Sequence, residues 1–302
     1  MNRRDFILGS VIGLAAGCRT NPAPAPTTDR ALLQREIDEV PAEVVGPYFK
    51  GESDAESLNA RYPALARLDG VLGRVISEAK ATVVTDRPAV WYVYNMGVVV
   101  KTREALFSID LCHRRAHEYA ADLDFAIISH NHEDHFTRRF YAEMDGRLHK
   151  TVITNFADNY GAAFNGGVCG FARGEKTFKL KDVTIRTHQS NHNHILPGFV
   201  MPVEVEFGDY TILHVGDTFN VEELKPARTP DLWIHHAYCW GLVTDRGVRN
   251  LKPKLTVVAH LQELHHRTGW SRFTFEQGEK AKLASEQNGS PAVVPAWGDR
   301  LI

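Results

Sequence analysis

The sequence predicts an α/β protein with a helical extension at its N-terminal end. From Ala89 onward, short runs of β-branched and aromatic residues alternate with loop and helical segments, as expected for the strands of a sheet protein. Residues 29–80 lack this texture and carry apolar residues at helical spacing instead. Several strand-like runs end directly in clusters of histidine and aspartate, which indicates a functional site built at the strand ends.

The composition is that of an ordinary globular protein and gives no reason to expect nucleic acid as a partner. The chain has 302 residues, of which 43% are hydrophobic and 24% charged, and this is ample for a packed core. A net charge of -2 lacks the basic excess that nucleic-acid binding favours. No segment after the N-terminus reaches the run of about 18 apolar residues that a membrane-spanning helix needs.

Residues 1–18 resemble a twin-arginine export signal that ends in a lipoprotein-type cleavage site. Arg3 and Arg4 precede a mild apolar run, and residues 14–18 resemble a lipobox in which Cys18 is the lipidated residue. The position three before the cysteine is Ala15 rather than the usual leucine, so a signal cleaved elsewhere, leaving a soluble protein, is the alternative. We therefore expect an exported protein, periplasmic or anchored to a membrane as a lipoprotein.

Residues 19–28 are a linker rich in proline and alanine, which is typical of an extended, stiff spacer. Residues 29–82 are the helical extension, and we expect them to pack on a catalytic domain of residues 83–302. A cover over the substrate is the alternative role for this extension. Its clearest apolar face is formed by five residues at helical spacing, Leu68, Val71, Leu72, Val75 and Ile76.

Three strands are predicted at the start of the catalytic domain, over residues 90–94, 97–100 and 105–109. Asp110 follows the third strand, where it is either the N-cap of a helix over residues 111–121 or, by the family resemblance described below, an acidic residue near the site. His113 and His117 lie four apart on that helix, at ligand spacing. Because they have no third partner nearby, we expect both to face solvent.

The densest cluster of metal-binding residue types is the segment Ser129 to His135, which follows a buried strand over residues 125–128. His130 and His132 are two apart, so in extended backbone they project to the same side and can share one cation. Asp134 and His135 follow on the turn and suit a second cation nearby. Imidazole and carboxylate are ligands for Zn, Fe or Mn, and no thiol is present in this segment to favour zinc.

Later strands also end in residues that can bind metal. We expect strands over residues 151–154, 183–187, 211–215, 231–234 and 255–259. His192 lies beyond the second of these, Asp217 follows the third by way of Gly216, and His260 follows the last. His265 and His266 trail His260 and are expected to be solvated, with donors at the pocket rim as the alternative.

Together these motifs resemble the metallo-β-lactamase superfamily, over roughly residues 83–297. This resemblance implies a four-layer αβ/βα sandwich with a binuclear metal site at one edge. It assigns His130, His132 and His192 to the first metal, with His194 as the alternative to His192. The remaining implied ligands are Asp134, His135 and His260 on the second metal, with Asp217 bridging both. We expect two divalent ions, with Zn ahead of Mn and Fe.

The resemblance also implies catalytic roles. Asp134 would orient the nucleophile, and His236 or Tyr238, from a segment similar to the Gly-Ala-Tyr of N-acyl phosphatidylethanolamine phospholipase D, would orient the substrate. The long N-terminal part and the Gly-Asp-Thr at residues 216–218 also look most like the lactonase and phospholipase D-like branch.

The function expected from the sequence is thus a binuclear metal-dependent hydrolase that attacks an ester, lactone or phosphodiester through a metal-bound hydroxide. The substrate would be a small molecule or lipid-like, and the sequence gives no oligomeric state. One alternative is a mononuclear iron oxidoreductase of the sulfur dioxygenase kind, which would use the first-metal ligands alone. The other is a non-catalytic surface module that keeps the metals for folding.

Overall fold

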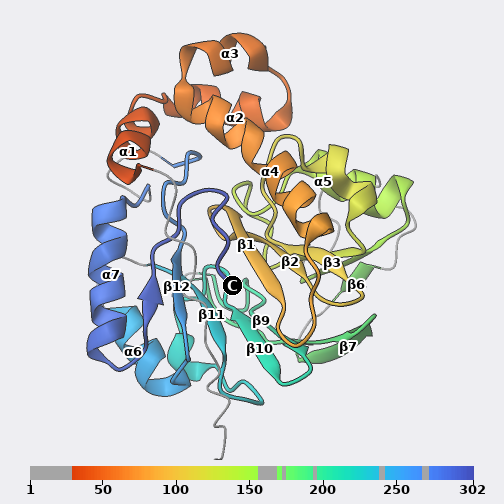
Figure 1. Cartoon of the computed structure of the whole chain (residues 1–302), viewed down its shortest axis with the longest axis vertical. Helices are drawn as coiled ribbons and strands as arrows, with labels where there is room; N and C mark the ends of the chain where they lie inside the picture. Colours follow the sequence, from red (N-terminus) through yellow and green to blue (C-terminus); the bar gives the residue numbers. More distant parts are fainter. Residues whose placement is uncertain (1–28, 156–168, 172–174, 193–195, 238–241, 267–271) are drawn as a thin grey trace, which may run out of the picture.

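The computed structural model describes residues 29–155, 169–171, 175–192, 196–237, 242–266 and 272–302. The predicted signal and linker lie outside the described residues, as do His194 and Tyr238. Two mixed sheets face each other at the centre of the molecule (Figure 1).

The first sheet has six strands in the order β1-β2-β3-β4-β5-β6. Strands β1 to β3 pair antiparallel, and β3 to β6 pair parallel. The strands are β1 Ala89–Tyr94, β2 Gly97–Lys101, β3 Leu106–Ile109, β4 Phe125–Ile128, β5 Thr151–Thr154 and β6 Cys169–Phe171.

The second sheet has seven strands in the order β13-β12-β11-β10-β9-β8-β7. Strands β7 to β10 pair antiparallel, and β10 to β13 pair parallel. The strands are β7 Lys176–Leu180, β8 Val183–Thr187, β9 Val203–Phe207, β10 Tyr210–His214, β11 Leu232–His236, β12 Thr256–Ala259 and β13 Ala292–Val293. In both sheets the parallel half sends its loops to one edge, which is where a site assembled from several loops can form.

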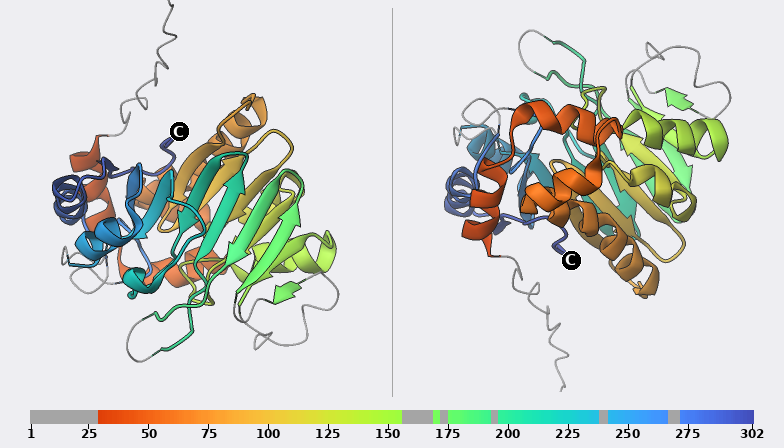
Figure 2. Two further views of the ribbon diagram at one scale, coloured as in Figure 1. Left: turned by 90° about the horizontal axis from the view of Figure 1, so that it is seen from below. Right: turned by 90° about the horizontal axis from the view of Figure 1, so that it is seen from above.

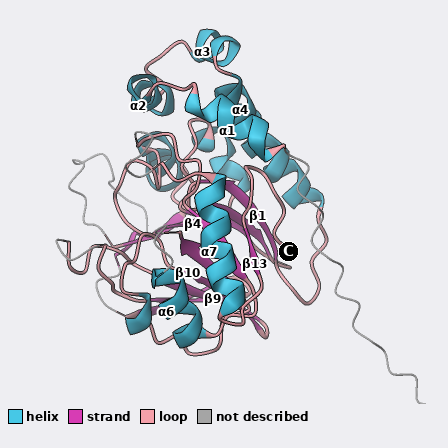
Figure 3. Cartoon of the chain, turned by 90° about the vertical axis from the view of Figure 1, so that its left-hand side faces the viewer, coloured by secondary structure: helices cyan, strands magenta, loops and turns pink. Residues whose placement is uncertain are grey.

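Helices cover the outer faces of both sheets and complete the predicted four-layer sandwich. Helix α4 (Pro63–Ala81) packs on β1 and β2, and α7 (Phe275–Gln287) packs on β12 and β13 beside α6 (Leu242–Leu251) (Figure 3). Beyond β4, the chain forms α5 (Arg138–Tyr141), which continues as one π-helical turn over Ala142–Arg147. Short 3₁₀ helices occupy Ala116–Asp122 and Val221–Glu223.

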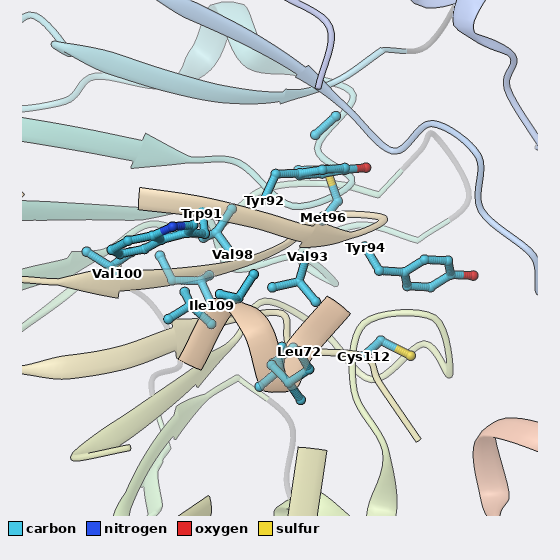
Figure 4. Packing of buried hydrophobic residues seen from close by; sticks show 14 of the residues in the cluster. Leu72, Trp91, Tyr92, Val93, Tyr94, Met96, Val98, Val100, Ile109 and Cys112 are labelled. Carbon is cyan, nitrogen blue, oxygen red and sulfur yellow. The ribbon is translucent and has the colours of Figure 1, made fainter. Parts of the chain in front are cut away.

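The predicted helical extension is four helices that share the core of the sandwich. They are α1 (Arg30–Asp38), α2 (Ala42–Lys50), α3 (Ala55–Arg61) and α4. The predicted apolar face of α4 is buried, and Leu72 joins the same cluster as Val93 and Ile109 of the first sheet (Figure 4). Seen from above, the red and orange helices of the extension lie in front of the strands (Figure 2).

The C-terminal residues cover the free edge of β1. The Leu301 N–H donates to the Val90 carbonyl at 2.8 Å, and the Tyr92 N–H donates to the Asp299 carbonyl at 2.9 Å. An exposed edge strand is a template for pairing with another chain, and this segment occupies that edge.

The helix predicted over residues 111–121 is wrong, because only a 3₁₀ helix over Ala116–Asp122 forms there. The expected exposure of His113 is wrong too, since its ring is buried. One ring nitrogen, Nε2, lies 2.8 Å from the Leu68 carbonyl, and the other, Nδ1, accepts from the Arg115 N–H at 3.1 Å. His113 therefore joins α4 to the sheet as a neutral ring with both nitrogens used.

Replacing His113 by glutamine should make the free energy of unfolding depend less on pH at acid pH. Burial lowers the pKa of His113 to about 4, whereas an unfolded histidine has a pKa of about 6.5. Between these values the unfolded chain binds the extra proton, so His113 makes stability fall as the pH falls, by up to about 1.4 kcal/mol per pH unit. The free energy of unfolding of the metal-free protein, measured with urea across this pH window, should depend less steeply on pH for His113→Gln than for the wild type. An unchanged slope would contradict the neutral buried ring.

Candidate metal centre

The seven predicted ligands lie at the edge where the two sheets send their parallel strand ends. The loop after β4 carries His130, His132, Asp134 and His135, and the turns after β10 and β12 carry Asp217 and His260. His192 comes from the loop after β8. All seven thus come from four strand ends, and the structure brings them together in two groups.

The first group contains His130, His132, His192 and Asp217, whose ligand atoms all lie within 4.8 Å of one another. His130 Nε2 lies 3.1 Å from His132 Nδ1, and His192 Nε2 lies 3.4 Å from Asp217 Oδ2. Three imidazoles thus converge on one carboxylate oxygen, which is a donor set suited to a divalent metal ion.

The second group contains Asp134, His135, His260 and Asp217, within the same 4.8 Å limit. His260 Nε2 lies 3.2 Å from Asp134 Oδ2 and 3.4 Å from Asp217 Oδ2, and His135 Nε2 lies 3.2 Å from Asp217 Oδ1. Asp217 belongs to both groups, so its carboxylate stands where an anion would separate two neighbouring dications. Metal binding by these residues stays a prediction.

The electrostatics of the second group fit a bound cation. Burial raises the pKa of Asp217, but His135 and His260 outweigh it and hold that pKa well below its usual range. For His260 burial acts in the opposite direction and lowers the pKa, but Asp217 and Asp134 outweigh burial and raise this pKa to about 10. In the ligand-free chain the buried carboxylates are therefore balanced by protons on imidazoles, which a metal ion would replace.

The ring nitrogens that face this group also fit a metal. Among the described residues, Nε2 of His135 and Nε2 of His260 are buried and make no hydrogen bond of normal geometry. Buried polar atoms are rarely left in this way without a ligand or an ordered water.

Asp110 holds two of the imidazoles in place. Its carboxylate accepts from His135 Nδ1 at 2.9 Å and from both the N–H and the hydroxyl of Ser129 at 2.6 Å. The Ser129 hydroxyl also lies 3.0 Å from His130 Nδ1. These contacts leave Nε2 of each ring facing the metal groups, which is how outer carboxylates orient ligating histidines. Of the two roles considered from sequence, Asp110 therefore has the one near the site.

Asn95 fixes Asp134 and was missed by the sequence analysis. Its side-chain NH₂ donates to the Asp134 backbone carbonyl at 2.9 Å and to Asp134 Oδ2 at 3.0 Å. The backbone carbonyl of Asn95 accepts from the His260 backbone N–H at 2.9 Å. Asn95 lies in the tight turn after β1 with φ of 56°, a conformation that asparagine tolerates well. Its sequence signal is that of any turn residue.

Gly216 is required by the close approach of two ligand-bearing turns. Its φ is 53°, and a Cβ there would lie 2.6 Å from the Ser129 hydroxyl and 2.9 Å from Val200 Cγ1. Any side chain would displace Ser129, and with it the hydrogen bonds that orient His130 and His135. The Gly-Asp pair therefore places Asp217 by letting two backbones meet.

His236 lies inside the centre. Its ring is buried and stacks on the His260 ring, with centroids 3.9 Å apart and planes 28° apart. Burial holds the pKa of His236 well below its usual range, so the ring is neutral. Its role as a substrate-orienting group stays a prediction, and that of Tyr238 falls outside the described residues.

The expectation that His265 and His266 are simply solvated is wrong, because both rings are bonded to Glu263. This fully buried carboxylate lies 3.0 Å from His265 Nδ1 and 2.5 Å from His266 Nδ1. Burial raises the pKa of Glu263, but these two histidines outweigh it and lower it to about 2. In the sequence Glu263 looks like any charged loop residue, so its role is visible only in the structure.

Comparisons with known proteins give the fold. No family model and no curated protein matches the sequence. Solved structures do match, among them one described as a possible metal-dependent hydrolase from Veillonella parvula, at 15% identity, a TM-score of 0.55, and coverage of 70% of this chain and 98% of that one. This chain has the metallo-β-lactamase fold.

Two further structures share this fold with the chain. An isothiocyanate hydrolase from Delia radicum gut bacteria is 16% identical, with a TM-score of 0.54 and coverage of 71% of this chain and 98% of that one. A variant of the β-hydroxylase CmlA of Streptomyces venezuelae is 15% identical, with a TM-score of 0.50 and coverage of 85% of this chain and 62% of that one. At such identities the similarity concerns the metallo-β-lactamase fold and leaves the reaction open.

Replacing Asp217 by alanine should lower the metal content of both groups at once, because one carboxylate serves both. Elemental analysis of purified protein measures this directly. Asp209→Ala, at an exposed aspartate in the turn before β10, is the matched control and should keep the wild-type content. Full metal retention in Asp217→Ala would show that this carboxylate is not the bridge.

Proposed function

We propose that this chain is a metal-dependent hydrolase that uses two divalent ions, with zinc as the first expectation, to cleave an ester, lactone or phosphodiester. The observation that carries the proposal is the pair of histidine and aspartate groups that share Asp217 at the edge of a metallo-β-lactamase fold. Two of the structures with this fold are named as hydrolases, which agrees with the proposal.

Two bound dications would supply an activated water and polarise the scissile bond. The chain's own residues prepare that chemistry. Burial lowers the pKa of His132 to about 4 and holds that of His130 well below its usual range, so both rings offer a neutral nitrogen near pH 7. Metal binding needs this form, because a protonated imidazole has no free lone pair.

Asp134 is the proposed orienting group for the nucleophile. Burial raises its pKa, but His135 and His260 outweigh burial and keep the carboxylate ionised. The amide of Asn95 holds one carboxylate oxygen, Oδ2, at 3.0 Å. A fixed, ionised carboxylate can accept a hydrogen bond from water and set its direction of attack. The neutral ring of His236, beside His260, is the proposed contact to the substrate.

Metal analysis joined to a substrate screen tests the proposal. We expect about two metal ions per chain and turnover of at least one member of a panel of lactones, carboxylic esters, phosphodiesters and phospholipids. Activity should vanish with a chelator and return with Zn, Mn or Fe. The outcome that would sink the proposal is a fully loaded protein that hydrolyses no member of the panel.

An iron-dependent oxygenase is the second candidate. The same imidazole and carboxylate donors suit iron, and the CmlA variant, a β-hydroxylase by name, matches more of this chain than the two hydrolases do. The complete second group argues against a mononuclear iron enzyme, and the metal bound and the reaction catalysed separate the hydrolase from an oxygenase. Iron with oxygen consumption would point to the oxygenase, and bound metal without turnover of any kind would point to a non-catalytic module.

We also propose that the protein is exported through residues 1–18 and tethered by a lipid on Cys18, with a lipid-like or small-molecule substrate of the lactonase or phospholipase D-like kind. Among the described residues, no helix is both long and apolar enough to cross a bilayer. The proline-rich linker before the catalytic domain suits a tether.

Labelling of cells with radioactive palmitate tests the tether. The native chain should take up label and sediment with membranes, and Cys18→Ala should do neither, because the acylated thiol is gone. Label that persists in Cys18→Ala would place the lipid elsewhere or show a different mode of anchoring.

A further inference from the structure

A cavity of about 340 Å³ lies between helix α2 and the loop that carries the metal ligands. This volume is at the low end of the range of about 300–1,000 Å³ in which small ligands bind. We call it the α2 pocket, and the residues that define it here are Gly46, Phe49, Lys50, Phe136, Arg139 and His265.

The α2 pocket adjoins the second ligand group. Glu133, which also lines it, directly precedes Asp134. On the other side, His265 is bonded to Glu263, and a carboxylate oxygen of Glu263 lies within 4.8 Å of Asp134 and His266 ligand atoms. The pocket is therefore near enough to the second group to be a candidate subsite for a substituent of a substrate held there.

The extension and the loop after β12 form one rigid wall. Phe49 of α2 packs on the His265 ring, with centroids 4.3 Å apart. The buried Arg272 donates to the Ile37 carbonyl of α1 at 3.3 Å and to the Leu264 carbonyl at 2.8 Å. The pocket wall supplied by α2 is thus fixed to the same loop that follows the last predicted ligand, His260.

Gly46 keeps the α2 pocket open. Glycine in a helix interior costs about 1 kcal/mol relative to alanine, and a Cβ added at Gly46 would meet nothing within 4 Å. Because Gly46 itself lines the pocket, a large side chain there is expected to take up part of this open space. Gly46 also precedes Pro47 inside the helix, where a Cβ would press on the proline ring, so an experiment has to separate these two reasons.

The lining indicates the class of group that fits. The rings of Phe49, Phe136 and His265 offer apolar and aromatic surface. The charged lining residues are Lys50, Arg138, Arg139, Glu52 and Glu133. Lys50 and Glu133 form an ion pair at 3.3 Å, which leaves two arginines against one carboxylate. An apolar group that carries a negative charge matches both features.

We propose that the α2 pocket is the subsite for the apolar part of an anionic substrate, so that the N-terminal extension determines specificity. The part of the inference that treats the bound group as part of a substrate rests on the proposed function. The claim that the pocket binds an apolar anion stands separately, because binding to the pocket is measurable without turnover.

Filling the pocket from Gly46 tests the proposal. The probe is 4-phenylbutyrate, an aromatic ring with a carboxylate, and its uncharged counterpart is 4-phenylbutanamide. Calorimetry on metal-loaded protein should show that the wild type binds the carboxylate more tightly than the amide. Gly46→Leu should weaken binding of 4-phenylbutyrate about tenfold or more, since its side chain occupies the space of the ring.

Two control variants isolate the filling effect. Gly46→Ala brings the same pressure on Pro47 but fills little space, and it should bind like the wild type. Gly70→Leu places the same side chain at a helix glycine of α4, where an added Cβ also meets nothing within 4 Å. It lies away from the α2 pocket, in the lining of a different cavity, and should also bind like the wild type. Equal losses in Gly46→Ala and Gly46→Leu would overturn the proposal.

Arg139→Gln keeps the charge requirement testable even if Gly46→Leu does not fold. It removes an exposed rim cation and should reduce the preference for the carboxylate over the amide, because one of the lining cations is gone. Binding of 4-phenylbutyrate should persist after a chelator removes the metals. If it disappears, the carboxylate binds the metals rather than the pocket, and the proposal fails.

A kinetic arm links the pocket to turnover. For mono-p-nitrophenyl adipate, Gly46→Leu should lower kcat/KM about tenfold, while p-nitrophenyl acetate should be cleaved at the wild-type rate. Equal losses for both esters would overturn the subsite. If the wild type cleaves neither ester nor any member of the screening panel while the probe still binds, the proposed function fails and the pocket stands.

Discussion

The buried carboxylates of Asp134 and Asp217 set the electrostatic constraint around which this protein is organised. Two ionised carboxylates at a sheet edge need positive charge within a few ångströms, because burial makes unpaired charge very costly. In the ligand-free chain the imidazoles of His135 and His260, from two different turns, supply it, and dications suit the same space. Closure of the two sheets against each other is what brings these groups, spread over residues 130–260 of the sequence, into contact.

These groups are supported by residues with positive φ in the turns that carry or adjoin the ligands. Asp110, Asn95 and His260 all have positive φ, an unusual conformation for residues with side chains. Each also makes a hydrogen bond that fixes the centre. Such strained residues persist when the surrounding structure holds them firmly, so the strands and helices of the sandwich stabilise the geometry of the site.

The strands and the seven grouped residues could be predicted because their signals are local. A buried strand followed by closely spaced histidines, or by Gly-Asp, is visible within a few residues, as at residues 125–135 and 211–217. The supporting residues have no such signal. Asp110 looks equally like a helix cap, Asn95 like a turn residue and Glu263 like a surface acid, and only the tertiary contacts distinguish these roles. His113 was misjudged because the expected helix does not form, and the chain instead turns its ring inward against α4.

The C-terminal segment along β1 has a consequence for the proposed membrane tether. Tethered copies would meet at a far higher local concentration than free ones, and sheet edges that can pair across molecules would then promote aggregation. Because residues 298–302 already satisfy the outward-facing amides and carbonyls of Val90 and Tyr92, this edge offers no template to a neighbour. Residues 298–302 thus oppose strand pairing between molecules at the β1 edge, even at high local concentration.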